Sequence, residues 1–114
     1  DMNLVIWPGP GEAPYDMPIR EGDVYLLPAG VRHSPQRPDP ESIGVVVEYQ
    51  RPVGELDGFE WVCFECSQLV HRVEVQVQAI DKDLPPLFQA FDADLEARTC
   101  PNCGALHPGK AGRL

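Results

Sequence analysis

The hydrophobic positions in the first half of the chain come in short runs that are separated by turn-forming residues. Three runs are rich in β-branched and large apolar side chains, at residues 4–7, 24–27 and 45–49. Runs of this length and composition are typical of buried β-strands. The chain also contains 13 prolines and 10 glycines, which favour short strands and tight turns over long helices. The first half is therefore predicted to be mainly β.

The segment that follows the second run predicts a hairpin. Pro28 and Gly30 indicate a tight turn, after which the chain would return as a strand over about 32–37. The returning strand would present His33 near its start and Arg37 four residues later. An imidazole held on a rigid sheet suits a metal site, whereas the alternative is a hairpin with a surface histidine.

The second half of the chain changes to an alternating strand followed by a helix. Residues 70–80 alternate between valine and polar side chains over much of their length, which predicts a strand with one buried face. Asp83 and the two prolines that follow it indicate a helix start. Apolar residues then recur at helical spacing and predict a helix over about 85–97: Leu87, Phe88, Phe91 and Leu95.

Composition and charge narrow the function classes. The 114 residues are 43% hydrophobic, an ordinary value for a globular protein. A formal net charge of −9 disfavours nucleic acid as a partner, because phosphate binding needs clustered Lys and Arg. No apolar run approaches the roughly 18 residues of a membrane span, and no signal peptide is visible. We expect a soluble cytoplasmic protein without a membrane partner.

Two Cys-x2-Cys pairs are the strongest chemical signal. Four thiolates complete a tetrahedral Zn²⁺ or iron site, and paired motifs in a chain expected to be cytosolic favour metal over disulfides. A closed four-thiolate site leaves no open position for a substrate, so we interpret it as a structural staple. His71 and His107 are predicted to be structural or surface residues. The four predicted ligands are Cys63, Cys66, Cys100 and Cys103.

Glu48 interrupts an otherwise apolar run at residues 45–49. Its carboxylate must face either solvent, as on an edge strand, or the protein interior. If it faces inward it needs a cationic or hydrogen-bonding partner, because an unpaired buried charge costs several kcal/mol. Arg37, on the preceding predicted strand, is the candidate neighbour.

The spacing Gly-x5-Pro-x-Gly-x2-His resembles the second signature motif of the cupin superfamily. The resemblance implies that His33 is the last metal ligand inside a small antiparallel β-barrel. Cupins often place Asn four residues after this histidine, whereas this chain has Arg37. The matching residues are Gly22, Pro28, Gly30 and His33.

The chain as a whole resembles the bacterial 3-hydroxyanthranilate 3,4-dioxygenase family. This likeness implies a mainly β fold: a partial cupin (jelly-roll-like) barrel over residues 1–58 and a rubredoxin-like four-cysteine metal-binding appendage with one helix over residues 59–114, packed on the barrel. The segments that carry the resemblance are residues 22–28, 33–38, 48–52, 56–61, 70–76, 83–88 and 100–104.

The resemblance also implies an activity, namely Fe²⁺-dependent opening of the 3-hydroxyanthranilate ring by O2 to 2-amino-3-carboxymuconate semialdehyde, the precursor of quinolinate. His33 would be a catalytic iron ligand, and Arg37 would clamp the substrate carboxylate. Glu48 would contact the ring substituents and manage protons, as both a catalytic and a substrate-binding residue. The four cysteines would hold a second iron or a zinc, and a homodimer is expected.

One part of the family pattern is absent from the sequence. The first cupin motif, with a second histidine, a glutamate and another arginine, would lie before Asp1, so we expect an N-terminal portion to be missing and this chain alone to be inactive. The alternative from another class is a non-catalytic cupin module that binds a small acid and carries a structural zinc ribbon. A zinc-ribbon nucleic-acid binder is disfavoured by the charge.

Overall fold

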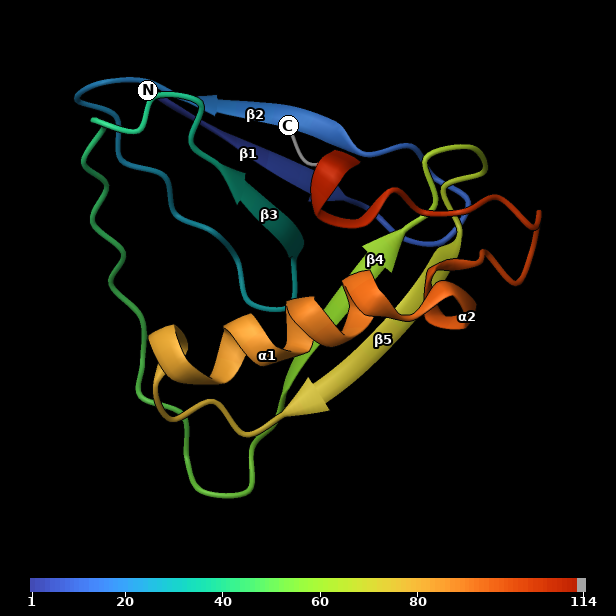
Figure 1. Cartoon of the computed structure of the whole chain (residues 1–114). Helices are drawn as coiled ribbons and strands as arrows, with labels where there is room; N and C mark the ends of the chain where they lie inside the picture. The colour runs from blue at the N-terminus through green and yellow to red at the C-terminus, as the bar shows by residue number, and fades with distance from the viewer. Residues whose placement is uncertain (113–114) are drawn as a thin grey trace. The chain divides into compact units, whose positions relative to one another are not determined.

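The structure, a computed structural model, describes residues 1–112, which form two compact units, residues 1–47 and 48–112. The domain boundary expected at residue 58 stays a prediction about folding domains. Both units contain antiparallel strands, and the helices lie in the second (Figure 1). The elements are β1 (Met2–Trp7), β2 (Tyr15–Ile19), β3 (Arg32–Gln36), β4 (Asp57–Val62), β5 (Leu69–Val75), α1 (Ile80–Ala93), α2 (Leu95–Arg98) and η1 (Gly109–Gly112).

The first unit is built on a three-stranded antiparallel sheet with the order β2-β1-β3. β1 is the central strand, and three of its apolar side chains are buried. Leu4, Ile6 and Trp7 are each 5% exposed or less. β3 pairs with β1 so that His33 lies opposite Ile6. The strand predicted over about 32–37 is therefore confirmed.

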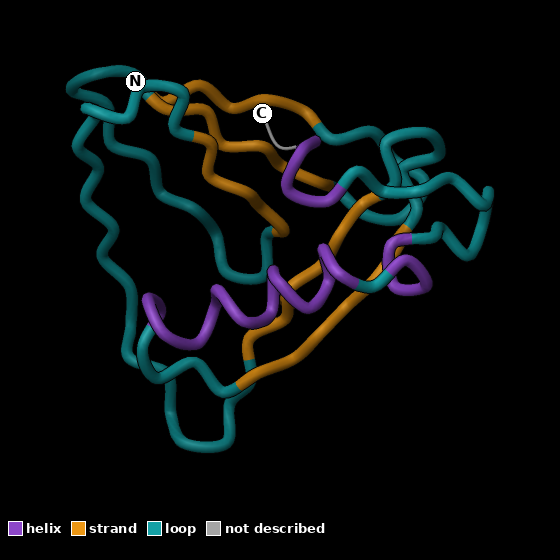
Figure 2. Tube along the Cα trace, viewed as in Figure 1, coloured by secondary structure: helices purple, strands orange, loops and turns teal. Residues whose placement is uncertain are grey.

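Two predicted strands are wrong, as is the hairpin between residues 24–27 and 32–37. Residues 24–27 and 45–49 belong to loops, which Figure 2 shows as long extended segments before β3 and before β4. β3 pairs with β1 instead of with residues 24–27. Val24 is 89% exposed and Val46 is 83% exposed. β-propensity describes a side chain that fits a half-buried pleated surface, and within residues 1–112 neither run has a strand partner.

The second unit contains a two-stranded antiparallel sheet of β4 and β5. Phe59 pairs with Val73, and the register shifts between Trp61 and Val62, just before the first cysteine pair. The strand predicted over residues 70–80 is present but ends at Val75. The alternation of valine with polar residues continues past that point without a strand, because β4 begins at Asp57, which pairs with Val75 and leaves nothing to pair beyond it.

The helix begins five residues earlier than predicted, because Asp83 acts from inside the helix instead of before it. Its carboxylate accepts hydrogen bonds from the backbone N–H groups of Gln78 at 2.8 Å and Ala79 at 2.9 Å. These two hydrogen bonds satisfy backbone N–H groups that have no partner inside the helix at its start. They stabilise one helical turn before Pro85 and Pro86. α1 ends at Ala93, and Asp94 then caps the short α2 by accepting from Glu96 N–H at 3.0 Å.

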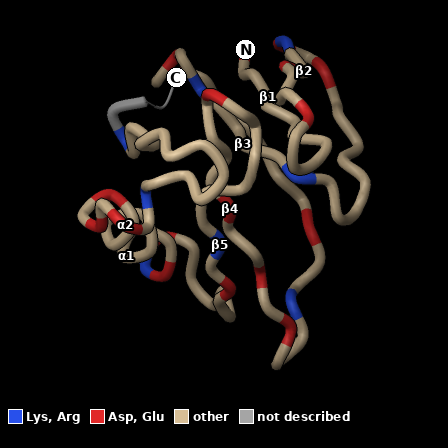
Figure 3. Tube along the Cα trace, turned by 90° about the vertical axis from the view of Figure 1, so that its right-hand side faces the viewer, with Lys and Arg blue, Asp and Glu red and all other residues tan. Residues whose placement is uncertain are grey.

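The core of the second unit lies between α1 and one face of the β4–β5 sheet (Figures 1 and 3). Phe91 is its centre, at 2% exposed, and its ring stacks on Trp61 with centroids 4.2 Å apart. Phe88 contacts Phe59 and Trp61 edge-on. The buried members of this cluster are Trp61, Cys63, Val70, Phe91 and Cys100. Two cysteines thus form part of the core itself.

Charge is distributed along both units, with 18 acidic against 9 Lys and Arg residues in the chain (Figure 3). In residues 1–112, none of the helices combines the length and the apolar character that a membrane crossing requires.

Candidate metal centre and candidate active-site residues

The first Cys-x2-Cys pair lies on a tight turn directly after β4. Cys63 N–H donates to the Gln68 carbonyl at 2.8 Å, and Ser67 N–H donates to the Cys63 carbonyl at 3.0 Å. Glu65 N–H points at the Cys63 Sγ at 3.4 Å. Ser67 adopts φ +59°, which is uncommon for a residue with a Cβ.

The second pair lies on a turn with the same backbone bonding. Cys100 N–H donates to the Ala105 carbonyl at 2.8 Å, and Gly104 N–H donates to the Cys100 carbonyl at 2.9 Å. Gly104 has φ +78° at the position where the first turn has Ser67. The chain therefore builds the same cysteine knuckle twice, once after a strand and once after the α2 helix.

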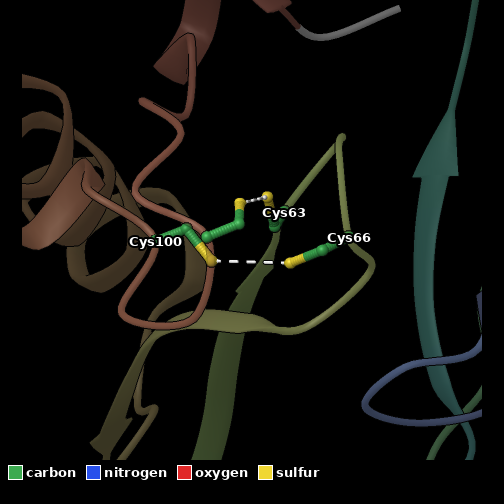
Figure 4. Close-up of side chains that lie close together, drawn as sticks. Cys63, Cys66 and Cys100 are labelled. Atoms are coloured by element: carbon green, nitrogen blue, oxygen red, sulfur yellow. Dashed lines mark hydrogen bonds between the residues drawn. The ribbon is translucent and has the colours of Figure 1, made fainter.

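The two knuckles face each other and bring their sulfurs together (Figure 4). The Sγ atoms of Cys63 and Cys103 are 3.6 Å apart, as are those of Cys66 and Cys100. All four sulfurs lie within 4.8 Å of one another. A tetrahedral ion with metal–sulfur bonds of about 2.3 Å needs sulfurs about 3.8 Å apart, so the spacing fits zinc or iron.

The electrostatics of the cluster also favour a cation. Hydrogen bonds from the Gln68 backbone and the Asn102 side chain lower the pKa of Cys66 to about 6. The Ala105 N–H favours the Cys103 thiolate as well, but the neighbouring thiols, Cys63 foremost, together with desolvation raise the pKa of Cys103 to about 12. Four adjacent thiolates repel one another, and a bound divalent cation removes that repulsion. The cysteines are free thiols here, so disulfides are not formed.

His33 lies on β3, the strand on which the sequence places it, and its side chain is exposed. Its Nδ1 is 2.8 Å from the Val31 carbonyl oxygen. Because a carbonyl can only accept, the neutral ring carries its hydrogen on Nδ1 and its lone pair on Nε2. A backbone carbonyl that fixes the tautomer in this way is a common support for a metal-binding imidazole.

Arg37 follows β3, and its guanidinium is held by Ser42. Nε donates to the Ser42 Oγ at 3.2 Å, and Nη2 donates to the Ser42 carbonyl. Ser42 Oγ in turn donates to the Asp39 carbonyl at 2.8 Å. The arginine therefore already spans two neighbouring acceptors with its fork of donors, the geometry with which it binds carboxylates.

Glu48 lies in the loop before β4 and pairs with Arg51, whose role was not predicted from the sequence. Its Oε1 accepts from the Arg51 Nη1 at 3.0 Å. Arg51 also forms an ion pair with Asp57, the first residue of β4. The hydrogen bond to Glu48, opposed by desolvation and helped by Asp57, raises the pKa of Arg51. The only signal in the sequence was the i, i+3 spacing of Glu48 and Arg51.

The convergence of His33, Arg37 and Glu48 in one pocket stays a prediction, because these residues are divided between two separately described units. Within residues 1–112, the cysteine cluster is the one group of three or more His, Cys, Asp or Glu side chains placed to hold a metal. His71 and His107 do not join it. His107 is 7% exposed, packs against Phe91 and accepts from Gly109 N–H at 3.0 Å, which is a structural role.

The antiparallel strands and the four-cysteine cluster define a mainly β protein with a group of side chains that could hold a metal. Comparison with known proteins then gives the family. The family model for 3-hydroxyanthranilic acid dioxygenase matches residues 2–92, and the chain belongs to this family. The resemblance inferred from the sequence is confirmed.

Individual relatives agree with the family model. A 3-hydroxyanthranilate 3,4-dioxygenase of Ruegeria pomeroyi is 60% identical over 110 residues, which cover 96% of this chain and 60% of that protein. Proteins of the same name from Brucella anthropi and Shewanella woodyi are each 62% identical over 96 residues, which cover 84% of this chain and 53% and 51% of theirs. The chain thus spans about half to three-fifths of the length of these relatives. The alignment to the Ruegeria protein extends well past the end of the family match at residue 92.

Proposed function

We propose that this chain acts as part of a longer Fe²⁺-dependent dioxygenase that opens the ring of 3-hydroxyanthranilate with O2 and yields 2-amino-3-carboxymuconate semialdehyde. The family match over residues 2–92 carries this proposal. The relatives that share 60–62% identity with the chain bear the name of that activity. The chain itself contributes one predicted iron ligand, so the remaining ligands would come from sequence outside it.

The proposed fold is a cupin barrel to which residues 1–58 contribute the later strands. Its support is a pair of β-prone segments in which most apolar side chains are exposed here, including Val24 at 89%, Leu26 at 86% and Val47 at 92%. Apolar side chains in such segments are normally covered by neighbouring strands. In the intact protein residues 24–27 and 45–47 would pair within the completed barrel, and Glu48 would follow the second of these segments.

The residues present fit a catalytic iron at one point, the Nε2 of His33. Its tautomer is fixed by the Val31 carbonyl at 2.8 Å, so the lone pair needed for a metal bond is available. Iron would supply open coordination positions at which the substrate and O2 meet. His33 would hold the metal on the β-sheet, where a rigid strand limits loss of geometry.

Arg37 and Glu48 are proposed to bind the substrate from this chain. The Arg37 fork would exchange Ser42 for the substrate carboxylate, and two parallel hydrogen bonds would fix the ring for attack. Glu48 would accept hydrogen bonds from the ring substituents and take or return a proton there. One of its oxygens already accepts a hydrogen bond from Arg51 at 3.0 Å.

The cysteine cluster is proposed to hold a structural metal, iron or zinc. With all four tetrahedral positions occupied by sulfur, it has none left for the reaction. The free thiols fit a reducing compartment, and we place the protein in the cytoplasm. The exposed edges of the β2-β1-β3 sheet would favour association of two copies as a homodimer. The product would feed quinolinate formation.

Two observations test the proposal. The coding sequence upstream of Asp1 should encode a His, a Glu about six residues later in the cupin pattern, and a nearby Arg. The intact iron-loaded protein should then convert 3-hydroxyanthranilate to a product that contains both atoms of isotope-labelled O2, measured by mass spectrometry. If the upstream ligands are missing and the labelled product does not form, the chain belongs to a non-catalytic small-acid-binding module.

A further inference from the structure

A chain of charged contacts connects Glu48 to the β4–β5 sheet, all of it within the second unit. Asp57 is the first residue of β4 and pairs with Val75, so its backbone position is set by the sheet. Its carboxylate and the Arg51 guanidinium form an ion pair. The far side of the same guanidinium donates to Glu48 at 3.0 Å. Arg51 thus links a fixed strand to the Glu48 carboxylate.

The contact between Arg51 and Asp57 is sheltered from water. The Arg51 Nε and Asp57 Oδ2 atoms that face each other are both buried, and the two side chains are 29% and 28% exposed. Glu48, at 49%, is the open end of the series. An ion pair shielded on one side holds its geometry better than one in bulk solvent, where side-chain entropy and screening oppose it.

A second contact fixes the loop that carries Arg51. Gly54 N–H donates to the Gln76 Oε1 at 2.8 Å, which joins the loop to the residue directly after β5. Glu55 N–H donates to the Pro52 carbonyl at 3.1 Å and closes a turn between the two anchors. The loop is therefore attached to β4 and to the residue that follows β5, which limits the movement of Arg51.

We propose that Arg51, held by Asp57, is a positioning residue that aims the Glu48 carboxylate at the substrate. The inference rests on the proposed function and deepens it: Arg51 would act through Glu48 and touch neither the substrate nor the metal. Its charge keeps the Glu48 side chain in one rotamer, with one oxygen engaged by Arg51 and the other free for the ring substituents. A displacement of about 1 Å at such a group costs up to about 100-fold in rate.

The same unit offers a matched control. Arg72 on β5 also bridges two carboxylates, with Glu60 at 2.5 Å and Glu74 at 2.8 Å. Like Arg51, it is one arginine between two carboxylates, but it has no proposed connection to Glu48. A purely structural role for a bridging arginine would appear equally at both sites.

The test is a double-mutant cycle on the intact iron-loaded enzyme. Arg51→Gln should lower kcat/KM and the anaerobic affinity for 3-hydroxyanthranilate by about 10-fold or more in the wild type, yet by less than about twofold in a Glu48→Gln background. Arg51→Lys should recover part of the loss, because one ammonium can engage one carboxylate at a time. Asp57→Asn should give a loss that Glu48→Gln also suppresses. Arg72→Gln should leave kcat/KM within about twofold, whatever it does to Tm.

The outcomes separate this inference from the activity on which it rests. If the intact wild type does not open the ring, the proposed function and this inference both fail. If the wild type is active but the effects of Arg51→Gln and Glu48→Gln on affinity multiply independently, Arg51 does not act through Glu48. Losses in Arg72→Gln equal to those in Arg51→Gln would likewise show general destabilisation and overturn the positioning role.

Discussion

Removal of the metal from the cysteine cluster should unfold the second unit. Of its five buried core residues, Cys63 and Cys100 are themselves predicted ligands. The other three, Trp61, Val70 and Phe91, contribute about 1.5–3 kcal/mol each on burial, or about 5–9 kcal/mol together. A structural Zn²⁺ supplies about 10 kcal/mol or more of folding free energy. A metal bound at the four cysteines would therefore provide at least as much stabilisation as these three buried side chains.

Trp61 reports this transition because it stacks on Phe91 and is 8% exposed. The difference in fluorescence between the wild type and a Trp61→Phe variant isolates its emission. We expect that emission to move to longer wavelength when a thiol-compatible chelator removes the metal, and to return when Zn²⁺ is added back. Cys100→Ser, which removes a buried ligand, should give the same shifted emission and a low yield of soluble protein.

The opposite result would refute the structural-staple interpretation. In that case, metal analysis would show an empty cysteine cluster while the Trp61 emission and the Tm remained those of the metal-bound protein. The apolar core would then suffice for folding. A soluble Cys100→Ser variant of normal Tm that retains two metals per chain would refute it equally.

Three further predictions concern single side chains. Arg37→Ala should weaken anaerobic binding of 3-hydroxyanthranilate by about 10- to 100-fold, the effect of losing a charged hydrogen bond of about 1.5–3 kcal/mol, whereas Arg20→Ala should not; equal affinities in a titration would remove Arg37 from the site. Phe91→Ala should lower the free energy of unfolding by about 3–5 kcal/mol in urea, and Phe64→Ala, at an exposed ring, by far less; similar losses would contradict the assigned core. Hydrogen bonds from the backbone N–H groups of Ala79 and Gln78 lower the pKa of Asp83. The stability that the Asp83 carboxylate contributes is therefore present above its unfolded pKa of about 3.9 and is lost as the pH falls through the lower folded pKa. The Tm difference between wild type and Asp83→Asn should shrink on acidification, and a constant difference would contradict this cause.

Local patterns in the sequence predicted the features that local chemistry decides. The cysteine spacing was sufficient to predict the cluster, because each Cys-x2-Cys pair closes its own knuckle through backbone hydrogen bonds within five residues. The helical spacing of apolar residues that includes Phe91 was sufficient to predict that α1 exists. Its start was missed because Asp83 can cap a helix from before it or from within it, and the sequence does not say which.

Features that depend on distant partners were not predictable in the same way. Residues 24–27 and 45–49 are β-prone, but a strand forms only where another strand pairs with it, and residues 1–112 supply no partner for either run. β3 likewise pairs with β1 and not with its neighbour in sequence. The link from Glu48 through Arg51 to Asp57 needed the folded loop, because nothing in the spacing of Arg51 and Asp57 indicates an ion pair.

The most direct test of the account compares O2 consumption by the intact iron-loaded protein and by its His33→Ala variant, with 3-hydroxyanthranilate as substrate. The account predicts equimolar uptake of O2 and substrate by the wild type, and loss of that uptake in His33→Ala while the metal at the four cysteines is retained. Uptake by His33→Ala at the wild-type rate, or none by the wild type, would contradict the assignment of His33 as an iron ligand of a ring-opening dioxygenase.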